Sequence, residues 1–148
     1  RDLCQANGSS VPGCVPSTTR ANVGPNGSES NGDVPAGQSI GMSGDGRFVV
    51  FASDATNLLG NAVDQPNGTF QIFLRDRGVD GDGLPIPGCT AATTLVSSAP
   101  DAGRGTASSS HPALAENGSA TAFLSSAANL LGPGVDANGV ADVFVRDR

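Results

Sequence analysis

An internal repeat is the feature of this sequence that most constrains its fold. Three groups of residues occur twice along the chain. Asn57-Leu58-Leu59-Gly60 returns as Asn129-Leu130-Leu131-Gly132, Phe73-Leu74-Arg75-Asp76-Arg77 as Phe144-Val145-Arg146-Asp147-Arg148, and Pro12-Gly13-Cys14 as Pro87-Gly88-Cys89. The spacing runs from 71 residues (Phe73 to Phe144) to 75 residues (Cys14 to Cys89), with small differences in loop length. The chain is therefore built from two tandem units of about 72 residues.

The composition predicts that these units are made of β-strands and turns. The 148 residues include no Lys, Tyr or Trp and only two Glu, whereas Gly occurs 21 times and Pro 10 times. Straight-chain residues that favour helices are scarce, and residues that favour turns are abundant. No segment has a sustained apolar period of 3.6 residues. We therefore predict an all-β fold.

Each unit is predicted to form a four-stranded antiparallel sheet. Alternating apolar residues mark the strands, and Asp-Gly or Asn-Gly pairs mark the turns at their ends. The expected strands are residues 38–42, 47–53, 69–76 and 92–98 in the first unit, and 111–115, 119–125 and 140–147 in the second. We expect four phenylalanines to be buried between sheets and four leucines to seal the sheet edges. These are Phe51, Phe73, Phe123 and Phe144, and Leu58, Leu59, Leu130 and Leu131.

Four-stranded sheets in tandem are the building unit of a β-propeller. Three strings carry a more specific resemblance: Gly46-Arg47-Phe48-Val49-Val50-Phe51, Ala55-Thr56-Asn57-Leu58-Leu59, and the segment from Asp136 to Asp147. They resemble the TolB-like, WD-type propeller repeats of secreted bacterial proteins. The segment from Arg1 to Arg20 also resembles a cysteine-bridged variant of that repeat. The resemblance implies propeller-type blades but little about function, because fold analogy alone does not assign one.

The order of the strands predicts an incomplete arrangement. We expect residues 1–23 to supply the fourth strand and cysteine loop of a preceding blade, residues 24–98 to form blade 1, and residues 99–148 to form blade 2 without its fourth strand. An unpaired sheet edge can accept a strand from another chain. The candidate donated strand consists of Thr18, Thr19, Arg20, Ala21, Asn22 and Val23. Copies of the chain would then join head to tail into a ring or a filament.

The three cysteines predict one local disulfide. Cys4 and Cys14 flank a short loop, and no Cys-x-x-Cys pair is present that could supply a zinc site. We favour a Cys4–Cys14 bond over two free thiols, which places the protein in an oxidising compartment as a secreted or cell-surface protein. Cys89 has no local partner and is expected to be free or to pair between molecules.

Several carboxylates and amides are candidates for calcium binding. Asp76, Asp80 and Asp82 alternate before Gly83, as in oxygen-rich calcium loops, although no bidentate Glu follows. The alternative is a solvated turn. A weaker set has the same two interpretations, since Asp and Asn also make turns without metal. It comprises Asp64, Asn67, Asp136, Asn138 and Asp142.

Two further motifs have a functional and a structural interpretation. Gly37-Gln38-Ser39-Ile40-Gly41 matches the nucleophile elbow of hydrolases, with His111 as the single histidine. That motif requires a strand, a turn and then a helix, whereas a hairpin turn is expected here. We favour structural roles for both residues. Four Asn-Gly-Ser/Thr sites are candidate glycosylation sites, but we favour turns there as well. These are Asn7, Asn26, Asn67 and Asn117.

The net charge of −6 argues against nucleic acid as a partner, because no basic stripe could neutralise phosphates. No apolar run approaches the ~20 residues that span a bilayer. We expect a non-enzymatic extracellular structural or interaction protein that binds other copies of itself or further blades of the same chain. The alternative is a ligand-binding propeller portion, stabilised by Ca²⁺, of a larger secreted bacterial protein.

Overall fold

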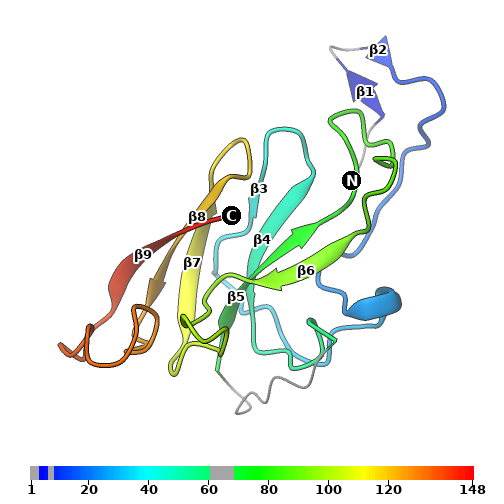
Figure 1. Ribbon diagram of the computed structural model, residues 1–148. Coiled ribbons are helices and arrows are strands. Elements are labelled where there is room, and N and C mark those ends of the chain that lie inside the picture. The colour runs from blue at the N-terminus through cyan, green and yellow to red at the C-terminus, as the bar shows by residue number, and fades with distance from the viewer. Residues whose placement is uncertain (1–3, 7–8, 61–68) are drawn as a thin grey trace.

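The computed structural model of the protein describes residues 4–6, 9–60 and 69–148 (Figure 1). This part of the chain is all-β, and its one helical element is the short 3₁₀ turn η1 (Pro25–Gly27). None of the described helices is long and apolar enough to cross a membrane. The all-β prediction is confirmed.

Sheet 1, as we call it, is four-stranded and antiparallel. It contains β3 (Gly41–Met42), β4 (Phe48–Ser53), β5 (Gln71–Asp76) and β6 (Ala92–Leu95), in that order. β4 and β5 pair along their full length, with Phe51 opposite Phe73. β6 pairs with the last four residues of β5, with Leu74 opposite Thr94 and Arg75 opposite Thr93.

Sheet 2 is the three-stranded counterpart formed by the second repeat. It contains β7 (Ser109–Leu114), β8 (Ala120–Ser125) and β9 (Asp142–Asp147), in that order. Phe123 lies opposite Phe144, as Phe51 lies opposite Phe73 in sheet 1. The register shifts between Ser110 and Ala113, where His111 has a positive φ of 52°. A separate two-stranded hairpin, β1 (Gln5–Ala6) and β2 (Ser9–Ser10), lies near the N-terminus.

Most predicted strands form within a few residues of the expected bounds, but two differ. The strand expected at 38–42 is reduced to Gly41–Met42. The strand expected at 18–23 does not form in the single chain: residues 18–22 are in no strand, and Val23 makes one isolated bridge to Glu29. A strand needs a hydrogen-bonding partner, and the partner expected for this segment belonged to another copy. Pairing between copies stays a prediction.

The main core lies between the two sheets. Sheet 1 contributes one face of its central strands, including Val50, Ile72 and Leu74, and sheet 2 contributes Phe123 and Phe144. The other face of sheet 1 holds a second cluster formed by Val49, Phe51, Ala55, Leu58 and Phe73, against which Ala21 of the N-terminal segment packs. Both faces of β4 are therefore buried, and the strand is almost continuously apolar.

All four predicted phenylalanines, Phe51, Phe73, Phe123 and Phe144, are buried. Only Phe123 and Phe144 lie in the core between the two sheets, as predicted, whereas Phe51 and Phe73 lie in the cluster on the other face of sheet 1. The four rings stack in pairs across the strands, at 6.0 Å between Phe51 and Phe73 and 5.8 Å between Phe123 and Phe144. The leucine prediction is wrong at one position. Leu58 and Leu130 are buried, but Leu131 is 56% exposed. The counterpart Leu59 is partly covered beside β6, and sheet 2 has no corresponding strand among the described residues.

Candidate interaction surfaces

The outer face of sheet 2, which points away from sheet 1, is apolar and open. Val143 and Val145 on β9 are 71% and 67% exposed. Their repeat counterparts on β5, Ile72 and Leu74, are 0% and 5% exposed because they pack against sheet 2. The same apolar pattern is thus covered in the first unit and uncovered in the second. An exposed apolar face of this kind is typical of a protein interaction site.

The outer face of sheet 1 exposes residues whose repeat counterparts in sheet 2 are buried between the two sheets. In sheet 2, Pro112 is fully buried and Leu114 packs against the core between the sheets. The register of the first strands makes Ile40 and Met42 their counterparts, because Met42 opposes Val49 as Leu114 opposes Thr121. Ile40 is 64% exposed and Met42 is 58% exposed. Positions that are buried between the sheets are therefore exposed on the far side of sheet 1.

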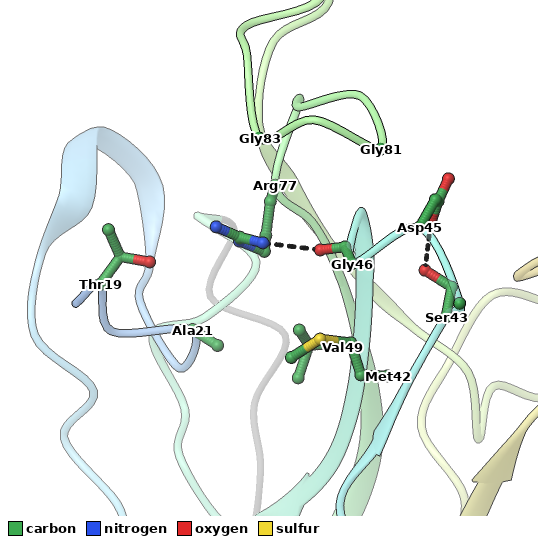
Figure 2. Close-up of a pocket in the computed structure, with 11 residues that line it drawn as sticks. Thr19, Ala21, Met42, Ser43, Asp45, Gly46, Val49, Arg77, Gly81 and Gly83 are labelled. Carbon is green, nitrogen blue, oxygen red and sulfur yellow. Dashed lines mark hydrogen bonds between the residues drawn. The ribbon is translucent and has the colours of Figure 1, made fainter. Parts of the chain in front are cut away.

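A hollow of about 410 Å³ lies on this outer face of sheet 1 (Figure 2). Met42 and Val49 line it beside Gly46, whose carbonyl accepts a hydrogen bond from Arg77 Nη1 at 2.7 Å. The counterpart of Gly46 in sheet 2 is Gly118, and there the ring of Phe48 fills the equivalent space. A Cβ built on Gly118 would lie 2.5 Å from Phe48 Cδ2. The space beside Gly46 is thus open, whereas the equivalent space beside Gly118 is filled.

The edge of β9 is a third candidate surface. In the described part of the chain β9 pairs with β8 alone, whereas its counterpart β5 pairs with strands on both sides. Leu131 and Val135 line a hollow beside β9, together with the side chains of the strand. Arg146 donates from Nη2 to the Ser98 carbonyl at 2.9 Å and also contacts Ser98 Oγ. The Arg75 side chain instead bonds a neighbouring strand, through Thr93 Oγ1 at 3.1 Å.

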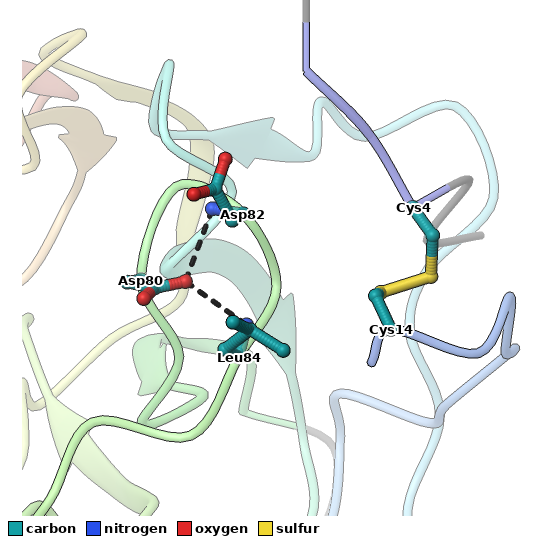
Figure 3. The surroundings of a disulfide bond; sticks show 5 residues. All are labelled: Cys4, Cys14, Asp80, Asp82 and Leu84. Atoms are coloured by element: carbon teal, nitrogen blue, oxygen red, sulfur yellow. Dashed lines mark hydrogen bonds between the residues drawn. A yellow bond between two sulfur atoms is a disulfide. The ribbon is translucent and has the colours of Figure 1, made fainter. Parts of the chain in front are cut away.

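The predicted disulfide is confirmed, with Cys4 and Cys14 bonded at 2.04 Å (Figure 3). It closes the loop that contains the β1–β2 hairpin. Cys89 is free, and its side chain is partly buried beside Arg47, whose Nη2 lies 3.4 Å from Cys89 Sγ. The disulfide is compatible with an oxidising compartment.

Sequence reasoning missed an ion pair that holds the end of β5. Arg47 binds Asp76 in a bidentate manner, with Nε to Oδ1 at 3.0 Å and Nη2 to Oδ2 at 2.7 Å. Asp76 Oδ1 also accepts the Gly78 amide at 2.8 Å. The hydrogen bonds from Arg47 and the Gly78 amide lower the pKa of Asp76, and those to Asp76 raise the pKa of Arg47. No repeat signal could have identified the pair, because the counterpart of Arg47 is Ser119.

Arg104 is a buried arginine. It lies in the connection before β7, with its guanidinium 5.5 Å from the ring centroid of Phe73. Burial lowers the pKa of Arg104 to about 10. A guanidinium over an aromatic face is a stabilising cation–π contact.

The structure does not bring the proposed calcium ligands together into one group. Asp76 is bound by Arg47, whereas Asp80 Oδ1 accepts the backbone amides of Asp82 and Leu84 at 3.0 and 2.9 Å (Figure 3). Asp80 therefore organises a turn. No group of three or more His, Cys, Asp or Glu in residues 4–6, 9–60 and 69–148 could hold a metal ion. Calcium binding stays a prediction.

Among the weaker candidates, Asn138 Nδ2 donates to Asp142 Oδ2 at 3.1 Å, and Asn138 Oδ1 accepts the Val140 amide at 3.0 Å. The structure assigns Asp136 to the wall of the hollow beside β9. Asn117 Oδ1 accepts the Ser119 amide at 3.0 Å in the turn before β8. Asn26 lies in η1 with a positive φ of 56°. Asp64, Asn67 and Asn7 lie outside the described residues.

Ser39 and His111 do not form the geometry of a nucleophile elbow. Gly41 begins strand β3, and a turn follows where the motif requires a helix. His111 Nδ1 lies 3.1 Å from Ser110 Oγ, and the His111 amide donates to Gln38 Oε1 at 2.8 Å. The bond to Gln38 joins β7 to the segment before β3, which is a structural role.

Comparison with known protein families, with curated proteins and with solved structures finds no match to this chain.

Proposed function

We propose that this protein is a non-enzymatic structural or interaction protein whose propeller-type units associate head to tail outside the cell. The observation that carries the proposal is the pair of uncovered faces. The outer face of sheet 2 repeats the face of sheet 1 that is buried in the main core, and the outer face of sheet 1 repeats the covered face of sheet 2. One copy can therefore place its sheet 2 against sheet 1 of the next copy.

The chemistry of the two faces supports this arrangement. Val143 and Val145 offer β-branched apolar side chains, and the opposing face offers Ile40, Met42 and the hollow beside Gly46. Burial of apolar area is the main favourable term in protein association. The contact joins different surfaces of the two copies, so it generates a ring or a filament according to whether the rotation closes. The Cys4–Cys14 disulfide supports an extracellular or cell-surface location.

Light scattering across a concentration series tests the proposal. The unmodified protein is expected to form assemblies larger than a monomer, whose mass rises with concentration. Val145→Asp should shift the equilibrium to the monomer, because association would bury the new charge without a partner. Val145→Ile keeps a β-branched apolar side chain and should still assemble. Pro100→Asp adds the same charge in an exposed turn between the sheets and serves as the second control. A monodisperse monomer at the highest concentration would contradict the proposal.

A ligand-binding, calcium-stabilised portion of a longer propeller remains the alternative proposal. In this alternative, further repeat units of the same chain cover the outer faces of sheet 1 and sheet 2. It predicts that the present chain stays monomeric and that Ca²⁺ raises its melting temperature. Thermal unfolding with Ca²⁺, with Mg²⁺ and with chelator therefore distinguishes the two proposals.

A further inference from the structure

We infer that the N-terminal residues Thr18, Thr19 and Arg20 of one copy pair with β9 of the preceding copy, whose sheet 2 packs on sheet 1 of the first, in the register that joins β6 to β5. The inference rests on the proposed head-to-tail association and specifies its edge contact. Three observations carry it: a repeated connector, a transferable register and the side-chain contacts of two arginines.

The connector that leads into sheet 1 is a structural copy of the connector that leads into sheet 2. Val23 bridges to Glu29 as Ser98 bridges to Arg104. The Val23 amide donates to the Ala21 carbonyl, and the Ser98 amide to the Val96 carbonyl, both at 2.9 Å.

The same side chain anchors both connectors to their sheets. Asn57 Nδ2 donates to the Glu29 carbonyl at 2.6 Å, and Asn129 Nδ2 to the Arg104 carbonyl at 2.9 Å. Asn57 Oδ1 accepts the Asn31 amide, as Asn129 Oδ1 accepts the Thr106 amide. Residues 21–31 therefore lie on sheet 1 as residues 96–106 lie on sheet 2.

This correspondence shows which strand is missing. The connector 96–106 is preceded by β6, which pairs with β5 of the preceding sheet. The connector 21–31 is preceded by residues 18–20, which are exposed and in no strand. β6 joins β5, which is the third strand of sheet 1, and the repeat counterpart of β5 is β9, the third strand of sheet 2. Residues 18–20 would therefore join a β9 strand. In Figure 1, β9 lies at one side of the molecule and the blue segment that leads into η1 lies at the other, so β9 of the same chain is not placed to pair with residues 18–20.

The register follows from the repeat. Leu74 lies opposite Thr94 and Arg75 opposite Thr93. The counterparts are Val145 opposite Thr19 and Arg146 opposite Thr18. The Val96 amide donates to the Ile72 carbonyl at 2.8 Å, and by the same correspondence the Ala21 amide donates to the Val143 carbonyl of the neighbour.

The arginine contacts fit this register. In sheet 1, Arg75 Nη1 donates to Thr93 Oγ1, and Thr93 Oγ1 donates in turn to the Val23 carbonyl of the preceding connector at 3.2 Å. In sheet 2, Arg146 reaches the carbonyl of Ser98, the counterpart of Val23, directly. The hydroxyl of Thr18 from a neighbouring copy would lie between the Arg146 guanidinium and the Ser98 carbonyl, as the Thr93 hydroxyl lies between Arg75 and the Val23 carbonyl.

Cysteine cross-linking between copies tests the register. Two single variants, Thr19→Cys and Val145→Cys, are each made with Cys89→Ser so that the Cys4–Cys14 bond is the only other disulfide. The two proteins are mixed, oxidised mildly and analysed without reductant. Directly opposed residues on antiparallel strands lie within the ~4.4–6.8 Å Cα separation that a disulfide spans. We expect a covalent dimer of one Thr19→Cys copy and one Val145→Cys copy.

The matched control replaces Val145→Cys with Val143→Cys, which is similarly exposed but two residues out of register. This mixture should lose the covalent dimer. The in-chain pair Leu74→Cys and Thr94→Cys should close within a monomer and shows that the position can form a disulfide. Assembly by light scattering without the 19–145 cross-link, or with an equal 19–143 cross-link, would overturn the register and leave the proposed function standing. The absence of both assembly and cross-link would overturn both.

Discussion

Cys4 and Gly78 occupy the same place in two copies of one loop. Both residues have a positive φ, 54° at Cys4 and 69° at Gly78. The Cys4 carbonyl accepts the Val11 amide at 2.8 Å, and the Gly78 carbonyl accepts the Ile86 amide at 2.8 Å. The cysteine that closes the first loop also has its counterpart, since Cys14 corresponds to Cys89. The second loop therefore keeps the backbone of the disulfide loop without its first cysteine.

Gly78→Cys is expected to form a disulfide with Cys89. A Cβ at Gly78 would meet no atom closer than the Ala91 amide nitrogen at 3.3 Å, and Cys4 shows that a cysteine tolerates this φ. Closing a loop of this length stabilises by about 2–3 kcal/mol on the chain-entropy estimate. Thiol titration of the unfolded protein should fall from one free thiol to none. Gly78→Ala measures the backbone strain alone. A variant with two titratable thiols would contradict the equivalence of the loops.

Phe73→Ala should destabilise the fold more than Phe144→Ala, although the two residues are counterparts. Phe73 lies on a strand paired on both sides and is fully buried, whereas Phe144 lies on the open edge strand β9. Loss of a buried phenylalanine typically costs about 3–5 kcal/mol, and less where the surroundings can close around the gap. Urea unfolding at a concentration that keeps the protein monomeric measures both values. An equal or larger loss for Phe144→Ala would show that the edge is as constrained as the centre.

Gly118 and Gly139 form a matched pair for testing the contact between the sheets. Their φ values are 72° and 71°, so replacement by Ala imposes the same backbone strain, about 1–2 kcal/mol. A Cβ at Gly139 would meet nothing within 4 Å, whereas a Cβ at Gly118 would lie 2.5 Å from the Phe48 ring. Gly118→Ala should therefore cost a further 1–3 kcal/mol, roughly, through overpacking. Similar losses in chemical denaturation would mean that Phe48 does not fill this space.

The Arg47–Asp76 pair predicts a contribution to stability that is lost in acid. Hydrogen bonds from Arg47 and the Gly78 amide hold the pKa of Asp76 below its ordinary value. Since the folded pKa is the lower one, the contribution is fully present above the unfolded pKa of about 3.9 and disappears as the pH falls through the folded value. Arg47→Gln should raise the pKa of Asp76 and flatten the pH dependence of the melting temperature in that window. NMR titration of the Asp76 carboxyl measures the pKa, and an unchanged value in the variant would contradict the assignment.

The sequence alone determined the local features of this protein. The repeat predicted where most strands lie, the hydrophobic pattern predicted that Phe73 and Phe144 are buried, and the spacing of Cys4 and Cys14 predicted the disulfide. These features depend on period-two alternation and on short-range chain geometry. The alternation and the short-range geometry depend only on residues close together in the sequence, so they can be recognised without knowing the contacts between distant parts of the chain.

Only the tertiary structure decided which of two equivalent faces is covered. Ile72 and Val143 lie at the same place in the same strand, yet one is fully buried and the other is exposed. The Arg47–Asp76 pair likewise depends on β4 and β5 lying side by side, and the segment at 18–23 remains without its predicted strand in the single chain. The physical reason is that burial and pairing are properties of what lies opposite a residue. The identity of that neighbour is set by the packing of whole sheets and not by the local sequence.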